Sequence, residues 1–221
     1  MELFLDTANL DEIKEILTWG VTKGLTTNQK IFQKEKGADF KEHVREILSM
    51  IDGPVSLEVT ESSLEGILKE AEQYSKWGKN VVIKVPMWGD GKGLRIASAL
   101  QKKGIKVNMT ALMSTAQVML AASLGTTYAS LFYNRIKDAK EDPERVIRES
   151  RAIVDQMDTK TKIIVGSIRD PSDVVKAALA GAHIVTVPYK MLVKMPFHIK
   201  TEETIKEFDA AWSDFLSGQK K

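Results

Sequence analysis

Lys84 lies in the middle of the apolar run Val81–Pro86, whose composition is typical of a fully buried strand. Lysine is almost never fully buried unless it has a partner or a function. Burial disfavours the ammonium form, and the neutral amine is the form that attacks a carbonyl carbon to give a Schiff base. The run by itself leaves two interpretations open. Lys84 is either a Schiff-base lysine or a structural one, paired with a carboxylate inside the fold or reaching past the strand end.

Further polar side chains with suitable chemistry lie at or just after the ends of other apolar runs. A Schiff-base lysine needs groups that move protons during dehydration and carbon–carbon cleavage, and Asp6, Glu58 and Thr110 supply two carboxylates and a hydroxyl. For any one such position, a helix cap is the commoner role. The convergence of several of them on one site is what predicts catalysis.

A second group of side chains consists only of hydrogen-bond donors. Arg135, Ser167 and Arg169 follow neighbouring runs, and the helix start Asp170-Pro171 comes next. Guanidinium groups and free helix amides both favour anions, so this cluster predicts a phosphate site. The alternative is a pair of arginines that bridges loop carboxylates.

Short apolar runs alternate with helical patterns along the whole chain, and these elements must position the polar groups. The expected strands are 3–6, 24–27, 55–59, 81–85, 105–110, 127–132, 162–167 and 183–188. Helix starts are indicated at Asn9, Ser114, Asp142 and Asp170. Glycines at 20, 78, 104, 125 and 181 precede the next strand and are expected to close helices.

Eight alternating strand and helix units in a chain of 221 residues predict one α/β domain over residues 1–221, a closed (β/α)₈ TIM barrel with an additional C-terminal helix. The competing fold is a doubly wound open sheet. The first turn, Asp6-Thr7-Ala8-Asn9, lacks the glycine-rich phosphate fingerprint of such sheets, which favours the barrel. In the barrel, the side chains at the strand ends meet at one rim. They are Asp6, Thr26, Thr27, Asn28, Glu58, Lys84, Asn108, Thr110, Arg135, Ser167 and Arg169.

The additional helix is expected at residues 200–217, with Ile205, Phe208, Trp212 and Phe215 near one face. This helix is not one of the elements that a (β/α)₈ barrel requires. The sequence leaves open whether it packs across the barrel end or docks on a neighbouring subunit.

Composition narrows the class of protein. A net charge of +2 without a basic block gives no reason to expect nucleic acid or a membrane surface as a partner, and no apolar run approaches a membrane span. The chain has no cysteine, and it enters structure without a leader pattern, so we expect a cytoplasmic protein. His43, His183 and His198 fall at positions that suggest structural roles, and no ligand spacing indicates a metal, so we expect a mechanism without metal or cofactor.

The chain resembles the small transaldolase family, which includes fructose-6-phosphate aldolases. The motifs that carry the resemblance run nearly end to end: 4–9 (FLDTAN), 24–28 (GLTTN), 82–86 (VIKVP), 108–110 (NMT), 134–136 (NRI), 167–169 (SIR) and 180–182 (AGA). The resemblance implies that Lys84 forms the Schiff base, that Asp6 is the acid/base for carbon–carbon cleavage, and that Glu58 and Thr110 hold the catalytic water.

Further roles are implied by the same resemblance. Thr26, Asn28, Asn108 and Phe132 would line the substrate site, with the two asparagines holding hydroxyls of the three-carbon donor unit, while Arg135, Ser167 and Arg169 bind phosphate. Family members are often homo-oligomers, pentamers or decamers that exchange C-terminal helices. We therefore expect sugar phosphates as small-molecule partners and a homo-oligomer.

Two positions indicate the subgroup. Glu58 and Phe132 resemble the transaldolase branch, whereas fructose-6-phosphate aldolases usually carry glutamine and tyrosine there. The mouth loops depart from the family: Gln29 and Lys30 follow Asn28 where proline is usual, Trp88 lies in the loop after Pro86, and Tyr133 replaces a smaller residue. These departures leave room for a sulfonated or otherwise specialised sugar.

The leading hypothesis is a transaldolase that moves a dihydroxyacetone unit from a ketose phosphate to an aldose phosphate, a reaction of the pentose phosphate pathway. The closest rival is a fructose-6-phosphate aldolase that releases free dihydroxyacetone. A rival of another class is a barrel that binds sugar phosphates without turnover; an unpaired buried lysine would bring such a protein no benefit.

Overall fold

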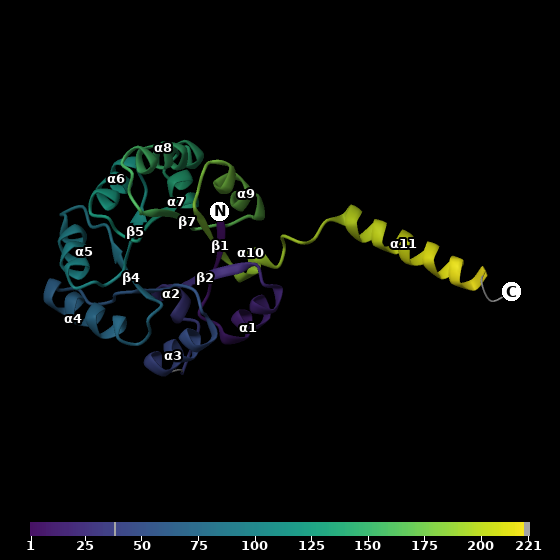
Figure 1. Ribbon diagram of the computed structural model, residues 1–221, viewed down its shortest axis with the longest axis horizontal. Coiled ribbons are helices and arrows are strands. Elements are labelled where there is room, and N and C mark those ends of the chain that lie inside the picture. Colours follow the sequence, from purple (N-terminus) through teal and green to yellow (C-terminus); the bar gives the residue numbers. More distant parts are fainter. Residues whose placement is uncertain (38, 219–221) are drawn as a thin grey trace.

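The computed structural model describes residues 1–37 and 39–218, in which eight parallel strands close into a barrel (Figure 1). The strands are β1 (Glu2–Asp6), β2 (Thr22–Thr26), β3 (Val55–Glu58), β4 (Val81–Pro86), β5 (Val107–Leu112), β6 (Tyr128–Phe132), β7 (Lys162–Gly166) and β8 (Ile184–Pro188). Each strand pairs with the next in sequence, and β8 pairs with β1. The predicted (β/α)₈ barrel is confirmed, and the open sheet is wrong.

Helices surround this barrel as an outer layer, and the last helix projects away from it (Figure 1). They are α1 (Leu10–Trp19), α2 (Gln29–Phe32), α3 (Phe40–Met50), α4 (Leu64–Ser75), α5 (Lys92–Lys102), α6 (Thr115–Ser123), α7 (Tyr133–Asp138), α8 (Pro143–Gln156), α9 (Pro171–Leu179), α10 (Tyr189–Leu192) and α11 (Ile199–Gly218). The side chains of Asn9, Ser114, Asp142 and Asp170 accept backbone N–H groups at the predicted helix starts. Of the five glycines expected to close helices, all but Gly78 adopt positive φ. The short helices α2, α7 and α10 were not predicted.

Strand limits differ from the predicted ones by up to two residues. The largest shift concerns β5, predicted at 105–110 and observed at Val107–Leu112. Pairing with β4 sets this register, because Ile83 lies opposite Val107 and Lys84 opposite Asn108. A parallel register depends on the neighbouring strand, so the local apolar pattern does not fix where a strand begins.

The interior of the barrel is filled by a small cluster of its own. Phe4, Val82, Tyr128, Ile164 and Ile184 are buried together, and the rings of Phe4 and Tyr128 meet edge to face at 6.2 Å. A larger core lies between the strands and the outer helices. Because strand side chains alternate between faces, the residue two positions after each member of the inner cluster also faces the interior, one layer nearer the carboxyl ends.

That next layer holds Asp6, Lys84, Ser130, Gly166 and Thr186. Each follows a member of the apolar cluster by two residues on the same strand. The cluster thus forms the floor beneath these five residues and shields the buried lysine from solvent on that side.

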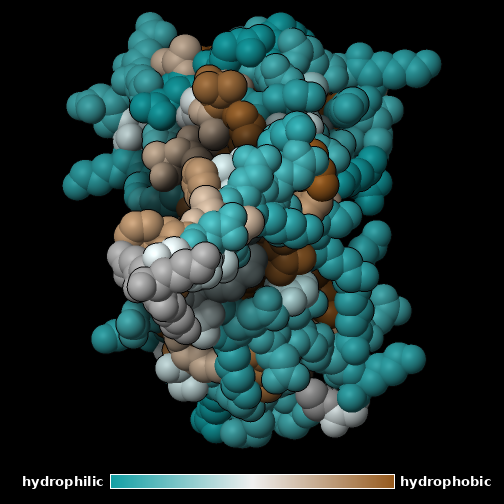
Figure 2. Space-filling view, turned by 90° about the vertical axis from the view of Figure 1, so that its right-hand side faces the viewer, coloured by the Kyte–Doolittle hydropathy of each residue, from teal (hydrophilic) through white to brown (hydrophobic). Residues whose placement is uncertain are grey.

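Helix α11 projects away from the barrel (Figure 1), and all its residues are exposed. The predicted helix is therefore present, but it does not pack across the barrel end. Figure 2 views the molecule from the side on which α11 lies and shows apolar atoms at the surface among hydrophilic ones. Within the described ranges, no helix is long and apolar enough to cross a membrane.

Candidate active site

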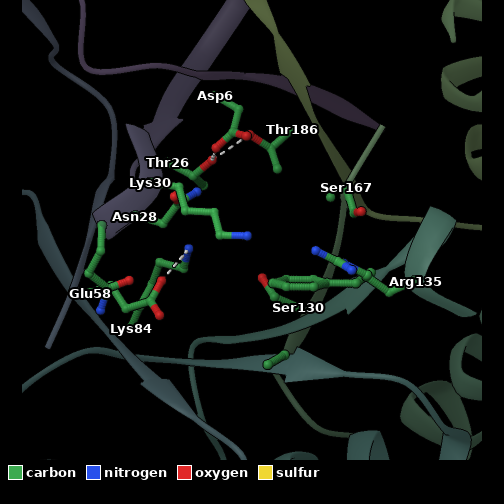
Figure 3. Close-up of a pocket in the computed structure, with 14 residues that line it drawn as sticks. Asp6, Thr26, Asn28, Lys30, Glu58, Lys84, Ser130, Arg135, Ser167 and Thr186 are labelled. Atoms are coloured by element: carbon green, nitrogen blue, oxygen red, sulfur yellow. Dashed lines mark hydrogen bonds and ion pairs between the residues drawn. The ribbon is translucent and has the colours of Figure 1, made fainter. Parts of the chain in front are cut away.

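A cavity of about 300 Å³ opens at the carboxyl ends of the strands. Its lining residues are Asp6, Thr26, Asn28, Gln29, Lys30, Glu58, Lys84, Ala111, Ser130, Phe132, Arg135, Gly166, Ser167 and Thr186. Figure 3 shows the labelled members of this set converging from several strands and from the segments that follow them. Eight of the eleven residues that the resemblance gave a role line this cavity: Asp6, Thr26, Asn28, Glu58, Lys84, Phe132, Arg135 and Ser167.

Lys84 comes from β4, and its side chain is 6% exposed. Its Nζ donates a hydrogen bond of 2.8 Å to the carbonyl oxygen of Thr27 and lies 3.2 Å from Glu58 Oε2. Of the two interpretations that the sequence left open, the structure shows the carboxylate partner. The same pair suits chemistry, because Glu58 lies where it can take a proton from the ammonium and leave the amine free to attack.

Asp6 ends β1 and faces the same cavity (Figure 3). Its Oδ1 accepts a hydrogen bond of 2.6 Å from Thr26 Oγ1, which in turn lies 2.6 Å from Thr186 Oγ1. Burial raises the pKa of Asp6 above its usual value, and the nearby charge of Lys84 offsets part of that rise. A raised pKa makes a carboxyl group better suited both to take up and to return a proton.

Asn108 and Thr110 come from β5 and are fully buried outside the lining of the cavity. Asn108 Nδ2 donates to Ser56 Oγ at 3.2 Å, while Asn108 Oδ1 and Thr110 Oγ1 have no partner among the described residues. Buried polar atoms of this kind are usually satisfied by water or ligand. β5 is irregular between Met109 and Leu112, and Ala111, with φ of 59°, turns toward the cavity.

Arg135 and Ser167 stand at the opposite side of the cavity from Lys84 (Figure 3). Ser167 has φ of 59°, which is strained for a residue with a side chain. Its carbonyl oxygen accepts hydrogen bonds from the backbone and side chain of Asn134 at 3.3 and 2.9 Å. Asn134 also donates to the buried carboxylate of Asp173 at 2.7 Å, so this network fixes the loop that presents Ser167.

Arg169 was predicted beside Arg135, but the structure places it outside the cavity lining. Its guanidinium donates two hydrogen bonds, of 2.8 and 2.6 Å, to the carboxylate of Asp138. Both side chains are about half exposed. This corresponds in part to the alternative that the sequence left open, a pair of arginines bridging loop carboxylates: one arginine is bridged, and its carboxylate ends helix α7.

Ser130 and Thr186 are lining residues that sequence analysis missed, whereas Lys30, already noted as a departure in the mouth loops, also lines the cavity. A signal for the first two existed, since Ser130 lies two residues before the predicted Phe132 and Thr186 two before the strand end, on the inward face. Lys30 belongs to α2, whose position no strand pattern indicates. Trp88 and Tyr133, suspected of reshaping the mouth, lie outside the lining: Trp88 packs under Lys92, and Tyr133 donates a hydrogen bond to Glu144.

Among the residues that the structure describes, no group of three or more His, Cys, Asp or Glu side chains is placed to hold a metal ion. The polar groups that line the cavity include a lysine, carboxylates, hydroxyls and a guanidinium.

Comparison with known proteins identifies a family that is consistent with the side chains found in the cavity. The family model described as Transaldolase/Fructose-6-phosphate aldolase matches residues 3–219. The chain belongs to that family. Three curated relatives, each named "Probable transaldolase", come from Caldicellulosiruptor saccharolyticus, Carboxydothermus hydrogenoformans and Roseiflexus castenholzii. They are 47%, 45% and 40% identical over 96%, 96% and 99% of this chain and 97%, 98% and 100% of their own.

The similarity to transaldolase-type enzymes extends along nearly the whole length of the chain. Among solved structures, a mandelate oxidase mutant matches with a TM-score of 0.58 at 12% identity, covering 85% of this chain and 64% of that one. This likeness concerns the barrel fold alone.

Proposed function

We propose that this family member is a transaldolase that moves a dihydroxyacetone unit from a ketose phosphate, such as sedoheptulose 7-phosphate or fructose 6-phosphate, to an aldose phosphate. The observation that carries the proposal is the buried Lys84, whose Nζ lies 3.2 Å from Glu58 in a cavity that also holds Asp6. A barrel that merely bound sugars would gain nothing from this placement.

In the proposed first half-reaction, Glu58 takes a proton from Lys84, and the amine attacks the C2 carbonyl carbon of the ketose. Glu58 returns its proton to the hydroxyl group of the resulting carbinolamine, which leaves as water and gives the iminium ion. Glu58 and the buried hydroxyl of Thr110 are the groups that hold this water. Asp6 then takes the proton of the C4 hydroxyl. The C3–C4 bond breaks, its electrons form the enamine on Lys84, and the shortened aldose leaves.

In the second half-reaction the enamine carbon attacks the aldehyde carbon of the acceptor, and Asp6 returns its proton to the new hydroxyl. Water then hydrolyses the iminium ion and frees Lys84. The raised pKa of Asp6 supports this double role. Asn28 and Asn108 would hold hydroxyls of the donor, and Arg135 and Ser167 its phosphate. Arg169 would join them only after leaving Asp138.

The side chains Glu58 and Phe132 support transfer over release. A carboxylate can pass a proton to the water and take it back, whereas the phenyl ring of Phe132 offers no donor that would protonate the enamine and release free dihydroxyacetone. This assignment would place the enzyme in the pentose phosphate pathway and in the cytoplasm.

Borohydride trapping tests the proposal directly. The enzyme is incubated separately with fructose 6-phosphate and sedoheptulose 7-phosphate, reduced, and mapped by peptide mass spectrometry. We expect a three-carbon adduct on Lys84, none in Lys84→Arg, and an undiminished adduct in the control Lys69→Arg, whose side chain is 77% exposed on α4. Unmodified Lys84 with both donors would contradict the Schiff base. Free dihydroxyacetone accumulating at a rate independent of an aldehyde acceptor would contradict transfer.

We also propose a homo-oligomer, a pentamer or decamer, in which α11 packs on a neighbouring copy. Phe208, Trp212 and Phe215 are 67%, 61% and 53% exposed on this projecting helix, and such apolar area is normally covered. Light scattering should show an assembly that Phe208→Glu dissociates. A monomeric native enzyme would overturn this part of the proposal.

A further inference from the structure

Lys30 is a cavity residue whose role the reaction above does not use. It is the second residue of α2, and its side chain lines the cavity. Figure 3 shows the ammonium group directed toward the middle of the cavity, between Lys84 and Arg135. Arg135 approaches from the opposite side, from α7.

The backbone that carries Lys30 is held in place on both sides. Asn28 caps α2, with its side chain and its carbonyl oxygen both accepting from the Ile31 N–H at 3.1 and 3.0 Å. Gln29 Nε2 donates to the carbonyl oxygen of Val59 at 2.9 Å, which ties the same turn to the end of β3. Lys30 therefore starts from a fixed point above the cavity, and its four-carbon stem reaches inward.

Charge is unevenly distributed across the cavity. Glu58 and Lys84 neutralise each other at 3.2 Å, and Arg169 is occupied by Asp138 outside. Within residues 1–37 and 39–218, Lys30 and Arg135 have no ion pair and no side-chain hydrogen bond, so two cations face the cavity without a partner. The remaining carboxyl group, Asp6, accepts a hydrogen bond from Thr26.

Such an arrangement matches a dianion better than a neutral sugar. A phosphate monoester carries a charge of about −1.5 to −2 at pH 7, which two unpaired cations complement. A lysine ammonium and an arginine guanidinium that approach from opposite sides can contact different oxygens of the same group. A sulfonate carries a single charge and would leave one cation unbalanced.

We propose that Lys30 determines specificity by binding, together with Arg135, the phosphate group of a phosphorylated sugar, and so takes the place of a second arginine in this site. The inference rests on the proposed function for the identity of the sugar, but the anion site itself does not. It makes Lys30, and not Arg169, the second cationic contact in the conformation that the structure shows.

The test starts with equilibrium binding of methyl phosphate to the full-length enzyme, measured by calorimetry at low salt. We expect Lys30→Gln to weaken binding by tenfold or more, Lys30→Arg to restore it to within threefold of wild type, and Lys69→Gln to leave it unchanged. Methanesulfonate should bind at least fivefold more weakly than methyl phosphate. Wild-type binding in Lys30→Gln, no binding to the wild type, or a preference for methanesulfonate would each overturn the proposal.

Kinetics then separate this inference from the proposed function. With fructose 6-phosphate as donor, kcat/KM should fall at least tenfold in Lys30→Gln, while trapping of dihydroxyacetone on Lys84 should change less than twofold, because that compound has no phosphate. An equal loss in kcat/KM for fructose 6-phosphate and in trapping of dihydroxyacetone would overturn the role of Lys30 in specificity. If the enzyme turns over no sugar but Lys30→Gln still weakens the binding of methyl phosphate, the proposed function is refuted and the anion site is supported.

Discussion

Removing one member of the Glu58–Lys84 pair should expose how strongly the two buried charges depend on each other. Two unit charges 3.2 Å apart attract by about 5 kcal/mol at an effective dielectric constant of about 20. Desolvation of both groups offsets part of this, so we expect a net coupling free energy of about 2 to 4 kcal/mol. The side chains are 6% and 15% exposed, which limits screening by salt.

The two single substitutions should lower the free energy of unfolding by different amounts. Glu58→Gln removes the ion-pair partner of Lys84. It should destabilise the native state by about 3 kcal/mol, although the ammonium keeps its hydrogen bond to the Thr27 carbonyl oxygen and the more distant charge of Asp6. Lys84→Met leaves the partly solvated carboxylate of Glu58 and should cost less. The double variant should recover most of the loss, because no unpaired charge remains.

Urea unfolding followed by circular dichroism measures all four proteins, with the protomer concentration held constant because assembly contributes to stability. The exposed pair Lys69–Glu65 on α4, with side chains 77% and 80% exposed, is the matched control and should couple by less than about 0.5 kcal/mol. Additive effects for Glu58 and Lys84, within about 0.5 kcal/mol, would refute the inference that these charges interact inside the barrel.

For three further substitutions, at Asp6, His183 and Gly93, the structure predicts the direction of the effect on stability. Because burial raises the pKa of Asp6, its contribution to stability is full below the unfolded value of about 3.9 and is lost as pH rises through the raised pKa. In melting scans, Asp6→Asn should therefore exceed the wild type in Tm at pH 8, with the difference shrinking toward pH 4, and should lose activity. Burial lowers the pKa of His183, so its contribution is full above about pH 6.5 and is lost as pH falls through the lowered pKa. His183→Asn, which keeps an acceptor for the Ile163 N–H, should lose less Tm than the wild type between pH 7 and pH 5. Gly93→Ala would place a methyl group 2.2 Å from the Pro86 carbonyl oxygen and should cost about 2 to 3 kcal/mol on urea unfolding, whereas Gly89→Ala meets open space and should change stability by less than about 0.5 kcal/mol.

Each of these three predictions could be contradicted by one result. A wild type and an Asp6→Asn variant with parallel pH profiles would mean that Asp6 titrates as it does in the unfolded chain. A steeper acid loss in His183→Asn than in the wild type would contradict a neutral, half-buried imidazole. Equal stability of the two glycine variants would show that α5 can move away from β4 without cost.

The architecture was predictable because it depends on local periodicities. Eight buried apolar runs alternating with helical patterns specify a closed parallel barrel, and the side chains Asn9, Ser114, Asp142 and Asp170 begin their helices through contacts within three residues. A barrel also fixes which end of the strands carries the site. Most of the predicted site residues therefore met in one cavity.

The misplaced or missed residues depend on contacts that no local pattern encodes. The limits of β5 lie two residues beyond the predicted ones, in a register that β4 sets, and Asn108 and Thr110 on this strand are fully buried outside the cavity lining. Arg169 turned outward because Asp138, at the end of a helix that was not predicted, offers it a carboxylate.

By itself, the sequence predicted a lysine buried near the end of the fourth strand, with a carboxylate on the preceding strand and another at the end of the first, because alternation and strand order follow from the chain. Tertiary structure alone decided which charges pair. Glu58 reaches Lys84, Asp138 takes Arg169, and Lys30 enters the cavity without a partner among the described residues. The physical reason is that an ion pair depends on distances of a few ångströms between side chains far apart in sequence, which only the closed barrel brings together.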